Sequence, residues 1–404
     1  MKTILFFEPE ISGHQLDYIE HMCIYYKGIS LPFRIIFIVN NCFYNTLKER
    51  GKEKLFDIFH NSGICFIEIK EKELKQCSSS YLPKAAIFKW FIAKKYALKN
   101  NVDHIHFMFF DHLQLPLALK LNIRCNFTIS GLLFRLALNY QKDSDTLVVK
   151  IRRFIKKILH QSMLNNRQVR TVFSLDPFFE EYAMNNFNNG LKVKALPDPS
   201  LFENKYTMYK DNLIDFSDPG RKMFVMFGYM QKRKGILQLL HSLKYLDNTI
   251  TSKLFIYIVG EIDESIKNEV INVEAEIRKI NNNIKLIIWD QYVSDRELVS
   301  LINSSDCILA PYQYFTGSSG VIFWAAGAGK PIITQDIGLL GKWTKEYQLG
   351  VATDTTKSSK IAGAILKVIT SGNEQLCDSK KMREFSNNHT PEKFAEIIHN
   401  NIGI

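Results

Sequence analysis

Short apolar segments of strand length alternate with helical segments along this chain, and the alternation occurs twice. Buried strands that alternate with helices are typical of a parallel sheet covered by helices on both faces. The sequence therefore predicts an α/β protein with two doubly wound domains. The strands expected in the first half are 3–7, 33–39, 64–69, 104–109, 125–129 and 171–174. Those expected in the second half are 223–228, 253–260, 284–289, 306–310 and 332–334, with a short strand near Val351.

A polar stretch separates the two halves. Residues 197–221 contain three prolines and have no apolar periodicity, which is typical of a linker. We therefore expect a first domain over residues 1–200, a linker over 201–222 and a second domain over 223–390. Ligands of doubly wound sheets bind outside the carboxyl ends of the strands, so the loops there are expected to carry the chemistry, in a cleft between the domains.

Several classes of protein are disfavoured by composition. The longest apolar runs fall short of the roughly 18 residues that a membrane-spanning helix needs. The N-terminal apolar run is broken by Glu8, Pro9 and Glu10, so we expect a first strand there and not a signal peptide. The seven cysteines form no Cys-x-x-Cys pair, which favours reduced thiols, a cytoplasmic location and no zinc site.

The formal net charge of +11 is partly concentrated in one helical segment. Residues 150–159 place apolar side chains opposite a set of cations, namely Arg152, Arg153, Lys156 and Lys157. Such a helix can lie on an anionic membrane surface, or it can pack its apolar face on its own domain. Residues 83–99 have a similar pattern and leave the same two interpretations open. Nucleic acid is not expected as a partner because no nucleic-acid-binding motif accompanies the charge.

The segment 306–341 predicts an anion site. An apolar strand ends at Pro311, the small residues Gly317, Ser318, Ser319 and Gly320 follow, and a helix begins directly after them. Free backbone N–H groups and the helix dipole favour phosphate at such a position. The alternative is a turn that needs glycine only for its geometry.

Three other loops follow predicted strands and carry candidate binding residues. Each has a simpler structural alternative: a capping histidine, a solvated run of charge or a packing tyrosine. The candidates are Gly13 and His14 after the first strand, Arg233 and Lys234 after strand 223–228, and Tyr292 after strand 284–289. Asp111 and His112 follow strand 104–109 and are candidates for proton transfer, although a polar turn explains them as well.

The order of these motifs resembles the second half of GT-B fold glycosyltransferases, most closely the retaining family four that uses nucleotide sugars. The likeness covers residues 223–345 and includes Lys234-Gly235, Val259-Gly260-Glu261 and the loop from Gly317 to Gly320. Over residues 1–200 it is carried by Gly13 and His14. The resemblance implies that Lys234 binds the donor diphosphate, that the glycine loop cradles it and that Gly13 closes over it. It also implies that the last helix, within 391–404, packs back on the first domain.

This chain departs from the family at four positions. Tyr229 stands where the family has an arginine, and Ser130 where it often has a histidine. Thr316 and Trp324 occupy the places of two glutamates that contact the donor sugar and the ribose hydroxyls. The resemblance therefore does not define the specificity for sugar or nucleotide.

The resulting prediction is a cytoplasmic glycosyltransferase that moves a sugar from a nucleotide-diphosphate donor to an acceptor hydroxyl. By resemblance it is a retaining, hexosyltransferase-type enzyme. No cofactor and no metal are expected, because cations and loop amides can balance the charge of the diphosphate and no Asp-x-Asp motif stands at a strand end. The basic helix favours a peripheral position at the inner face of the plasma membrane and a saccharide or lipid-linked saccharide acceptor, as in capsule, O-antigen or other envelope polysaccharide synthesis. Two alternatives remain open: a sugar-nucleotide epimerase with the same fold, and a catalytically silent subunit that binds nucleotide sugar.

Overall fold

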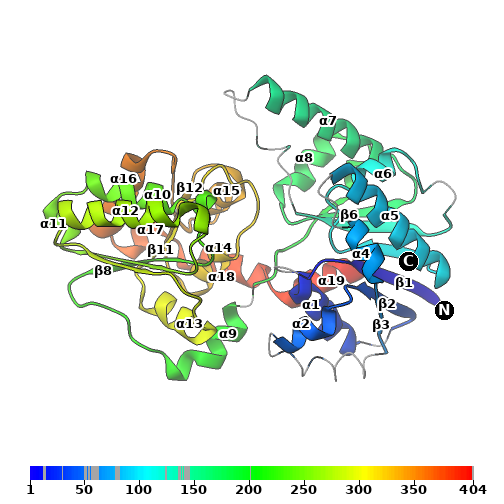
Figure 1. Cartoon of the computed structure of the whole chain (residues 1–404), viewed down its shortest axis with the longest axis horizontal. Helices are drawn as coiled ribbons and strands as arrows, with labels where there is room; N and C mark the ends of the chain where they lie inside the picture. Colours follow the sequence, from blue (N-terminus) through cyan, green and yellow to red (C-terminus); the bar gives the residue numbers. More distant parts are fainter. Residues whose placement is uncertain are drawn as a thin grey trace. The chain divides into compact units, whose positions relative to one another are not determined.

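A computed structural model describes residues 1–11, 15–29, 31–49, 52, 55, 63–77, 82–122, 125–134, 138, 140, 146–200 and 202–402. The chain forms two compact units (Figure 1). The first unit consists of Met1–Asp198 with Pro391–Ile404, and the second unit consists of Pro199–Thr390.

The first unit is built on a seven-stranded parallel sheet with the order β3-β2-β1-β4-β5-β6-β7. Strand β1, which lies between β2 and β4, is buried from Thr3 to Glu8, as expected for a sheet covered on both faces. The strands are β1 (Lys2–Glu8), β2 (Phe33–Val39), β3 (Cys65–Glu68), β4 (His104–Phe107), β5 (Thr128–Leu133), β6 (Val169–Ser174) and β7 (Val193–Ala195). The helices are α1 (Gln15–Lys27), α2 (Phe43–Glu49), α4 (Glu71–Cys77), α5 (Leu82–Lys99), α6 (Gln114–Ala118), α7 (Leu147–Leu164), α8 (Phe178–Asn186), η1 (Gly190–Lys192) and α19 (Pro391–Asn401).

The second unit repeats this architecture with six parallel strands in the order β10-β9-β8-β11-β12-β13. The strands are β8 (Lys222–Phe227), β9 (Leu254–Val259), β10 (Lys285–Trp289), β11 (Cys307–Ala310), β12 (Ile332–Gln335) and β13 (Gly350–Thr353). The helices are α9 (Phe202–Tyr209), η2 (Lys210–Asn212), η3 (Lys232–Lys234), α10 (Ile236–Ser242), η4 (Leu243–Tyr245), α11 (Asn248–Thr251), α12 (Glu264–Ile280), α13 (Asp295–Ser304), α14 (Gly320–Gly327), α15 (Gly338–Glu346), α16 (Ser358–Thr370), α17 (Asn373–Leu376) and α18 (Ser379–Asn388). The prediction of two doubly wound α/β units is thus confirmed.

Some elements differ from the sequence-based expectation. Strand β5 begins three residues later than expected and continues to Leu133, and the three-residue strand β7 was not expected at all. Residues 201–222, expected to be a linker, contain α9, which contacts α13 and α14 within the second unit. Phe202 explains this helix, because its buried ring packs edge-on against Trp324 at 5.4 Å between centroids.

Helix α19 is the last helix of the chain, and it completes the core of the first unit. Phe394, Ala395 and Ile398 are fully buried in a cluster with Ile4, Phe6 and other residues of β1, α1 and β2. The Phe394 ring lies 4.7 Å from that of Tyr18, and the Thr171 hydroxyl donates to the Asn401 carbonyl at 2.7 Å.

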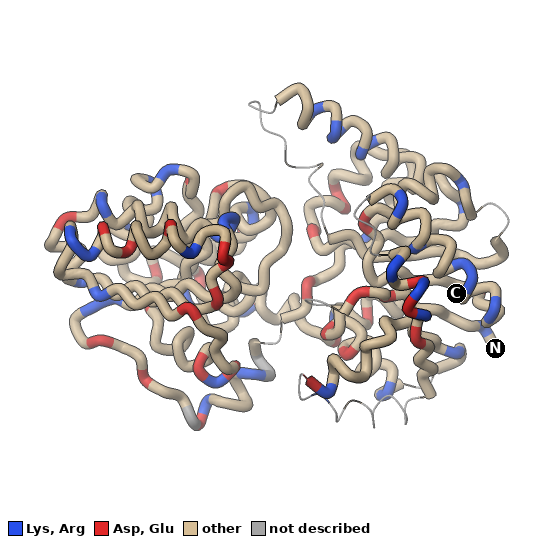
Figure 2. Tube along the Cα trace, in the orientation of Figure 1, with Lys and Arg blue, Asp and Glu red and all other residues tan. Residues whose placement is uncertain are grey.

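The two basic helical segments have different environments. In α5, Trp90 is completely buried, so its apolar face packs in the core of the first unit. In α7, the side that faces the unit carries His160, Met163 and Leu164. The opposite side exposes large apolar side chains: Leu147, Val148, Ile151, Phe154, Ile155 and Ile158 are all about half exposed or more. Figure 2 shows, in blue, the lysines and arginines along this helix. Among the described residues, no helix is long and apolar enough to cross a membrane.

Candidate donor-binding site

The site begins where β8 and β9 end, because two glycines let these strand ends approach each other. Gly228 and Gly260 both have positive φ, at 94° and 132°. A Cβ atom on Gly260 would lie 2.3 Å from the Gly228 carbonyl oxygen, so only glycine fits there. Both glycines line a pocket at the carboxyl ends of the strands.

Lys234 lies beside this opening on the short helix η3. Its side chain is mostly buried, and Nζ donates to the Phe227 carbonyl at 3.3 Å. The same Nζ is 5.0 Å from the centroid of the Tyr312 ring. The π face of this ring stabilises the positive charge. Gly235 ends η3 with φ 79°, and a Cβ there would lie 2.0 Å from the Pro311 carbonyl oxygen. The turn is therefore packed directly on the segment that follows β11.

The side chain of Arg233, the residue before Lys234, lies over the rings of Tyr312 and Phe315. Its guanidinium carbon is 4.9 Å from the Phe315 ring centroid and 5.9 Å from that of Tyr312. Within the described part of the chain, neither Arg233 nor Lys234 forms an ion pair with a carboxylate. Aromatic rings hold both positive charges, together with the Gln231 side-chain oxygen for Arg233 and the Phe227 carbonyl for Lys234, and no carboxylate of the described residues compensates them.

The glycine–serine loop leads into the N-terminus of α14. Ser319 is the N-cap residue, yet its side chain does not cap the helix, because its hydroxyl bonds the Tyr312 hydroxyl at 2.8 Å. A Cβ on Gly320 would meet no atom within 4 Å, so the space in front of the first helical residue is open. Gly317 and Ser318 precede it in the same loop. Tyr312 thus links the loop to Lys234, and this buried residue was not singled out from the sequence.

A pocket of about 310 Å³ adjoins the Gly228–Gly260 contact within the second unit. Its walls are mostly apolar, and Tyr292 lies on its rim with 79% of its surface exposed. Glu261 and Asp295 are the two acidic side chains that line it. Its lining residues are Phe227, Gly228, Tyr229, Val259, Gly260, Glu261, Tyr292, Val293, Asp295 and Leu298.

The two positions that depart from the glutamate pattern are also in this unit. Thr316 lies in the loop before Gly317. Trp324 lies on α14, where its ring is 6.3 Å from that of the pocket residue Phe227. Lys205 of α9 places its Nζ 5.7 Å from the centroid of the Trp324 ring. An indole and a lysine therefore occupy the surroundings in which the resemblance implied a carboxylate.

The candidates of the first unit are less complete. Gly13 and His14 lie outside the described residues. Asp111 is buried and accepts a hydrogen bond from the Phe134 amide at 3.1 Å. With His112 it lines a separate pocket of about 340 Å³ beside α7, which also includes Lys156 and His160. Burial lowers the pKa of His160 to about 4, so this histidine is neutral near pH 7.

Ser130, which stands where the family often has a histidine, lies in the core of the first unit. Its hydroxyl bonds His104 at 2.7 Å and His106 at 2.8 Å. Burial lowers the pKa of His104 to about 3, so the histidine is uncharged there. These bonds join polar side chains of β4 and β5 inside the sheet, whereas Nε2 of His106 has no hydrogen-bond partner among the described residues. No group of three or more His, Cys, Asp or Glu side chains suited to a metal ion occurs in the described ranges.

Comparisons with known proteins bear on the family and the fold. Residues 214–389 match the family model for glycosyl transferases group 1, which covers nearly all of the second unit. No curated protein matches the sequence significantly.

Solved structures match over the whole chain. A sucrose-phosphate synthase from Thermosynechococcus elongatus has a TM-score of 0.68 at 15% identity and covers 99% of this chain and 98% of its own. A glycosyltransferase from Rickettsia africae has a TM-score of 0.65 at 16% identity and covers 99% and 97%. The HepE protein of Anabaena, solved in complex with UDP, has a TM-score of 0.62 at 12% identity and covers 99% of both chains.

The whole chain therefore has the GT-B fold of glycosyltransferases. Its second unit carries the match to the group 1 glycosyl transferases, and together these findings support a glycosyltransferase of the GT-B type.

Proposed function

We propose that this protein is a glycosyltransferase that takes its sugar from a nucleotide-diphosphate donor bound in the second unit. The observation that carries the proposal is the grouping of Lys234, Arg233 and the start of α14 next to the pocket of Tyr292. A planar base fits the apolar pocket, and a diphosphate fits the two uncompensated cations and the open helix N-terminus. Retention of configuration and transfer of a hexose are part of the proposal and rest on the family resemblance.

Breaking the bond between sugar and diphosphate leaves negative charge on the diphosphate. Lys234 and Arg233 stabilise that charge most when it is fully developed, together with the backbone N–H groups of the loop before α14. Since Lys234 is held by Phe227 and Tyr312, little reorganisation is needed when the charge forms. We expect these groups, and no metal ion, to supply the charge balance.

UDP is the nucleotide to test first, because HepE of Anabaena was solved with UDP. We expect Lys234→Ala to weaken UDP binding about tenfold or more, since hydrogen bonds to charged groups contribute roughly 1.5–3 kcal/mol. Lys232→Ala is the matched control, because Lys232 is exposed on the same short helix. Calorimetric titration with UDP, GDP and ADP decides the matter. If none of the three binds, the proposed function is wrong.

We further propose that the acceptor is a saccharide carried on lipid and that α7 holds the enzyme peripherally on an anionic membrane surface. Helix α7 combines an exposed apolar stripe with cations on the rest of its surface, which is the pattern of a helix lying in the lipid interface. Met163, Leu164 and His160 attach the opposite side to the first unit, so the apolar stripe faces away from the part of the core that the described residues form.

Flotation with vesicles of phosphatidylglycerol and phosphatidylcholine tests the docking. We expect the wild type to float and a Phe154→Ser, Ile158→Ser variant to remain in solution. Charge reversal at Arg152 and Lys157 should reduce flotation in a salt-dependent manner. Phe91→Ser is the matched control, since Phe91 is 48% exposed on the other basic helix. Equal flotation of all variants would remove α7 from the proposal.

A further inference from the structure

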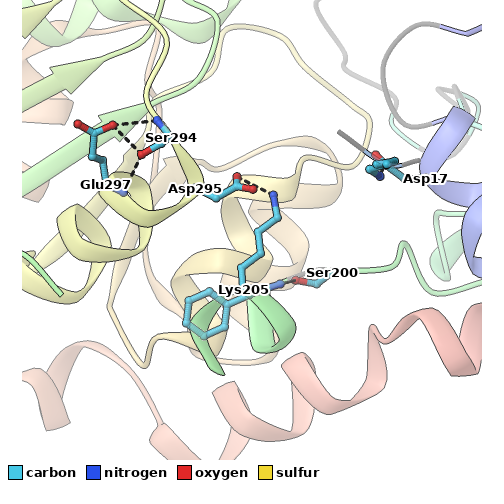
Figure 3. A network of polar contacts seen from close by, with 8 residues as sticks. Asp17, Ser200, Lys205, Ser294, Asp295 and Glu297 are labelled. Carbon is cyan, nitrogen blue, oxygen red and sulfur yellow. Dashed lines mark hydrogen bonds and ion pairs between the residues drawn. The ribbon is translucent and has the colours of Figure 1, made fainter. Parts of the chain in front are cut away.

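Asp295 is held in a fixed position on the wall of the nucleotide pocket. It is the first residue of α13, and the Lys205 ammonium donates to its Oδ1 at 2.7 Å. Figure 3 shows Lys205 reaching from α9 to this carboxylate. The helix start itself is fixed by a capping box, in which Ser294 and Glu297 bond each other's backbone N–H groups.

The aromatic side chains around Lys205 explain why it stays in place. Its ammonium lies over the Trp324 ring, and Trp324 packs edge-on against Phe202 at 5.4 Å and Phe227 at 6.3 Å. Lys205 thus contacts two side chains at once, the π face of Trp324 and the carboxylate of Asp295. Oδ2 of Asp295 has no hydrogen-bond partner among the described residues, and 40% of the side chain is exposed.

Oδ2 of Asp295 is suited to accept a hydrogen bond from a sugar hydroxyl of a ligand in this pocket. Apart from the two acids and the hydroxyls of Tyr229 and Tyr292, the described walls are apolar side chains and glycine backbone, which suit the faces of a base. The two carboxylates are therefore the charged acceptors available to a sugar hydroxyl in the described part of the pocket. Glu261 is the other acid on the wall, and its side chain is exposed and makes no hydrogen bond or ion pair in the described part of the structure. A fixed acceptor loses less conformational freedom on binding than a mobile one, so Asp295 is the better candidate.

We propose that Asp295 accepts a hydroxyl of the donor's ribose and so selects ribonucleotides over deoxyribonucleotides, with Lys205 as its positioning residue. This inference rests on the proposed function and assigns a residue to its nucleotide subsite. Lys205 also offsets the negative charge of Asp295, which would otherwise repel the diphosphate of the same ligand.

Nucleotide binding with and without the ribose hydroxyls tests the inference. Titrations use the tightest binder among UDP, GDP and ADP, with its 2′-deoxy and 3′-deoxy forms. We expect the wild type to bind the ribonucleotide about tenfold more tightly than at least one deoxy form. In Asp295→Asn the ribonucleotide should lose most of this advantage, while the corresponding deoxy form binds within about twofold of its wild-type affinity. That unchanged deoxy affinity also shows that the variant is folded.

The control variants separate this role from a general charge effect. Glu264→Gln removes the same charge from α12, where the side chain is 88% exposed, and should leave the preference unchanged. Lys205→Met should reduce the preference, and adding it to Asp295→Asn should have little further effect. The inference is overturned if Asp295→Asn keeps the wild-type preference for the ribonucleotide. It is also overturned if Asp295→Asn weakens the binding of the ribonucleotide and of its 2′-deoxy and 3′-deoxy forms equally. Binding that depends on Lys234 but shows no such preference in the wild type would refute this inference alone, whereas no binding of UDP, GDP or ADP would refute the proposed function.

Discussion

Replacing Glu8 with glutamine should change how the stability of the first unit depends on pH. Glu8 ends β1, is completely buried, and accepts the Glu10 amide on Oε1 at 2.9 Å. Its other oxygen has no hydrogen-bond partner in the part of the chain that the structure describes. Desolvation by burial raises the pKa of this carboxyl from 4.5 to about 8, so the folded protein keeps it protonated near neutral pH.

The direction and size of the effect follow from proton linkage. Between about pH 5 and pH 8 the unfolded chain has lost this proton and the folded chain retains it, so stability falls as the pH rises. One pKa unit corresponds to about 1.4 kcal/mol, so the penalty at pH 7 is on the order of 3 kcal/mol. Glutamine resembles the protonated acid in shape and does not ionise. The advantage of Glu8→Gln over the wild type should therefore be small near pH 5 and grow by about 1.4 kcal/mol per unit towards pH 8.

Urea titrations monitored by hydrogen exchange of the β1 segment measure this unit specifically. Glu181→Gln is the control, because it removes an exposed carboxylate from α8 of the same unit. The reasoning is refuted if the difference between Glu8→Gln and the wild type stays constant from pH 5 to pH 8.

Two further predictions concern stability. Gly235→Ala should destabilise the second unit by more than 1 kcal/mol, because its φ is positive and the new Cβ would overlap the Pro311 carbonyl; Gly363→Ala, with open space around it on α16, should be neutral or stabilising in the same thermal melts. Phe394→Ala should cost the first unit about 3–5 kcal/mol, as large truncations in cores do, whereas Phe91→Ala should change it little. Hydrogen exchange that accelerates in β1 but not in β8 would support the second prediction, and equal acceleration in both strands would contradict it.

The sequence was most informative where structure depends on local pattern. The buried strands and their order of alternation predicted both sheets, and the loops after β8, β10 and β11 were correctly expected at carboxyl ends of strands. The basic helices show the limit of such reasoning. Both α5 and α7 combine cations with an apolar stripe, yet α5 buries Trp90 and α7 exposes Phe154. Amphipathicity describes the helix alone, whereas its partner is set by tertiary packing.

Contacts between distant residues were beyond the sequence for the same reason. Lys205 and Asp295 are 90 positions apart, and their pairing depends on α9, which forms in a segment that has the composition of a linker. Tyr312 was overlooked because an aromatic residue after a strand usually serves packing alone. Its hydroxyl contact with Ser319 and its ring contact with Lys234 become visible only when η3 and the loop before α14 are brought together.

Because α19 belongs to the first unit, that unit begins to be synthesised first but can complete its fold only after the second unit has been made. The first unit is translated first, but the apolar surface formed by β1, β2 and α1 is not covered until Phe394 and Ile398 have been made. The second unit is continuous in sequence, from Pro199 to Thr390, and can complete its own core before the last helix exists. During translation the earlier unit must therefore wait for the later one with part of its core uncovered, a state that is prone to aggregation. Removing α19 (Pro391–Asn401) from the end of the chain should therefore destabilise the unit made at its beginning, because part of that unit's core would stay uncovered.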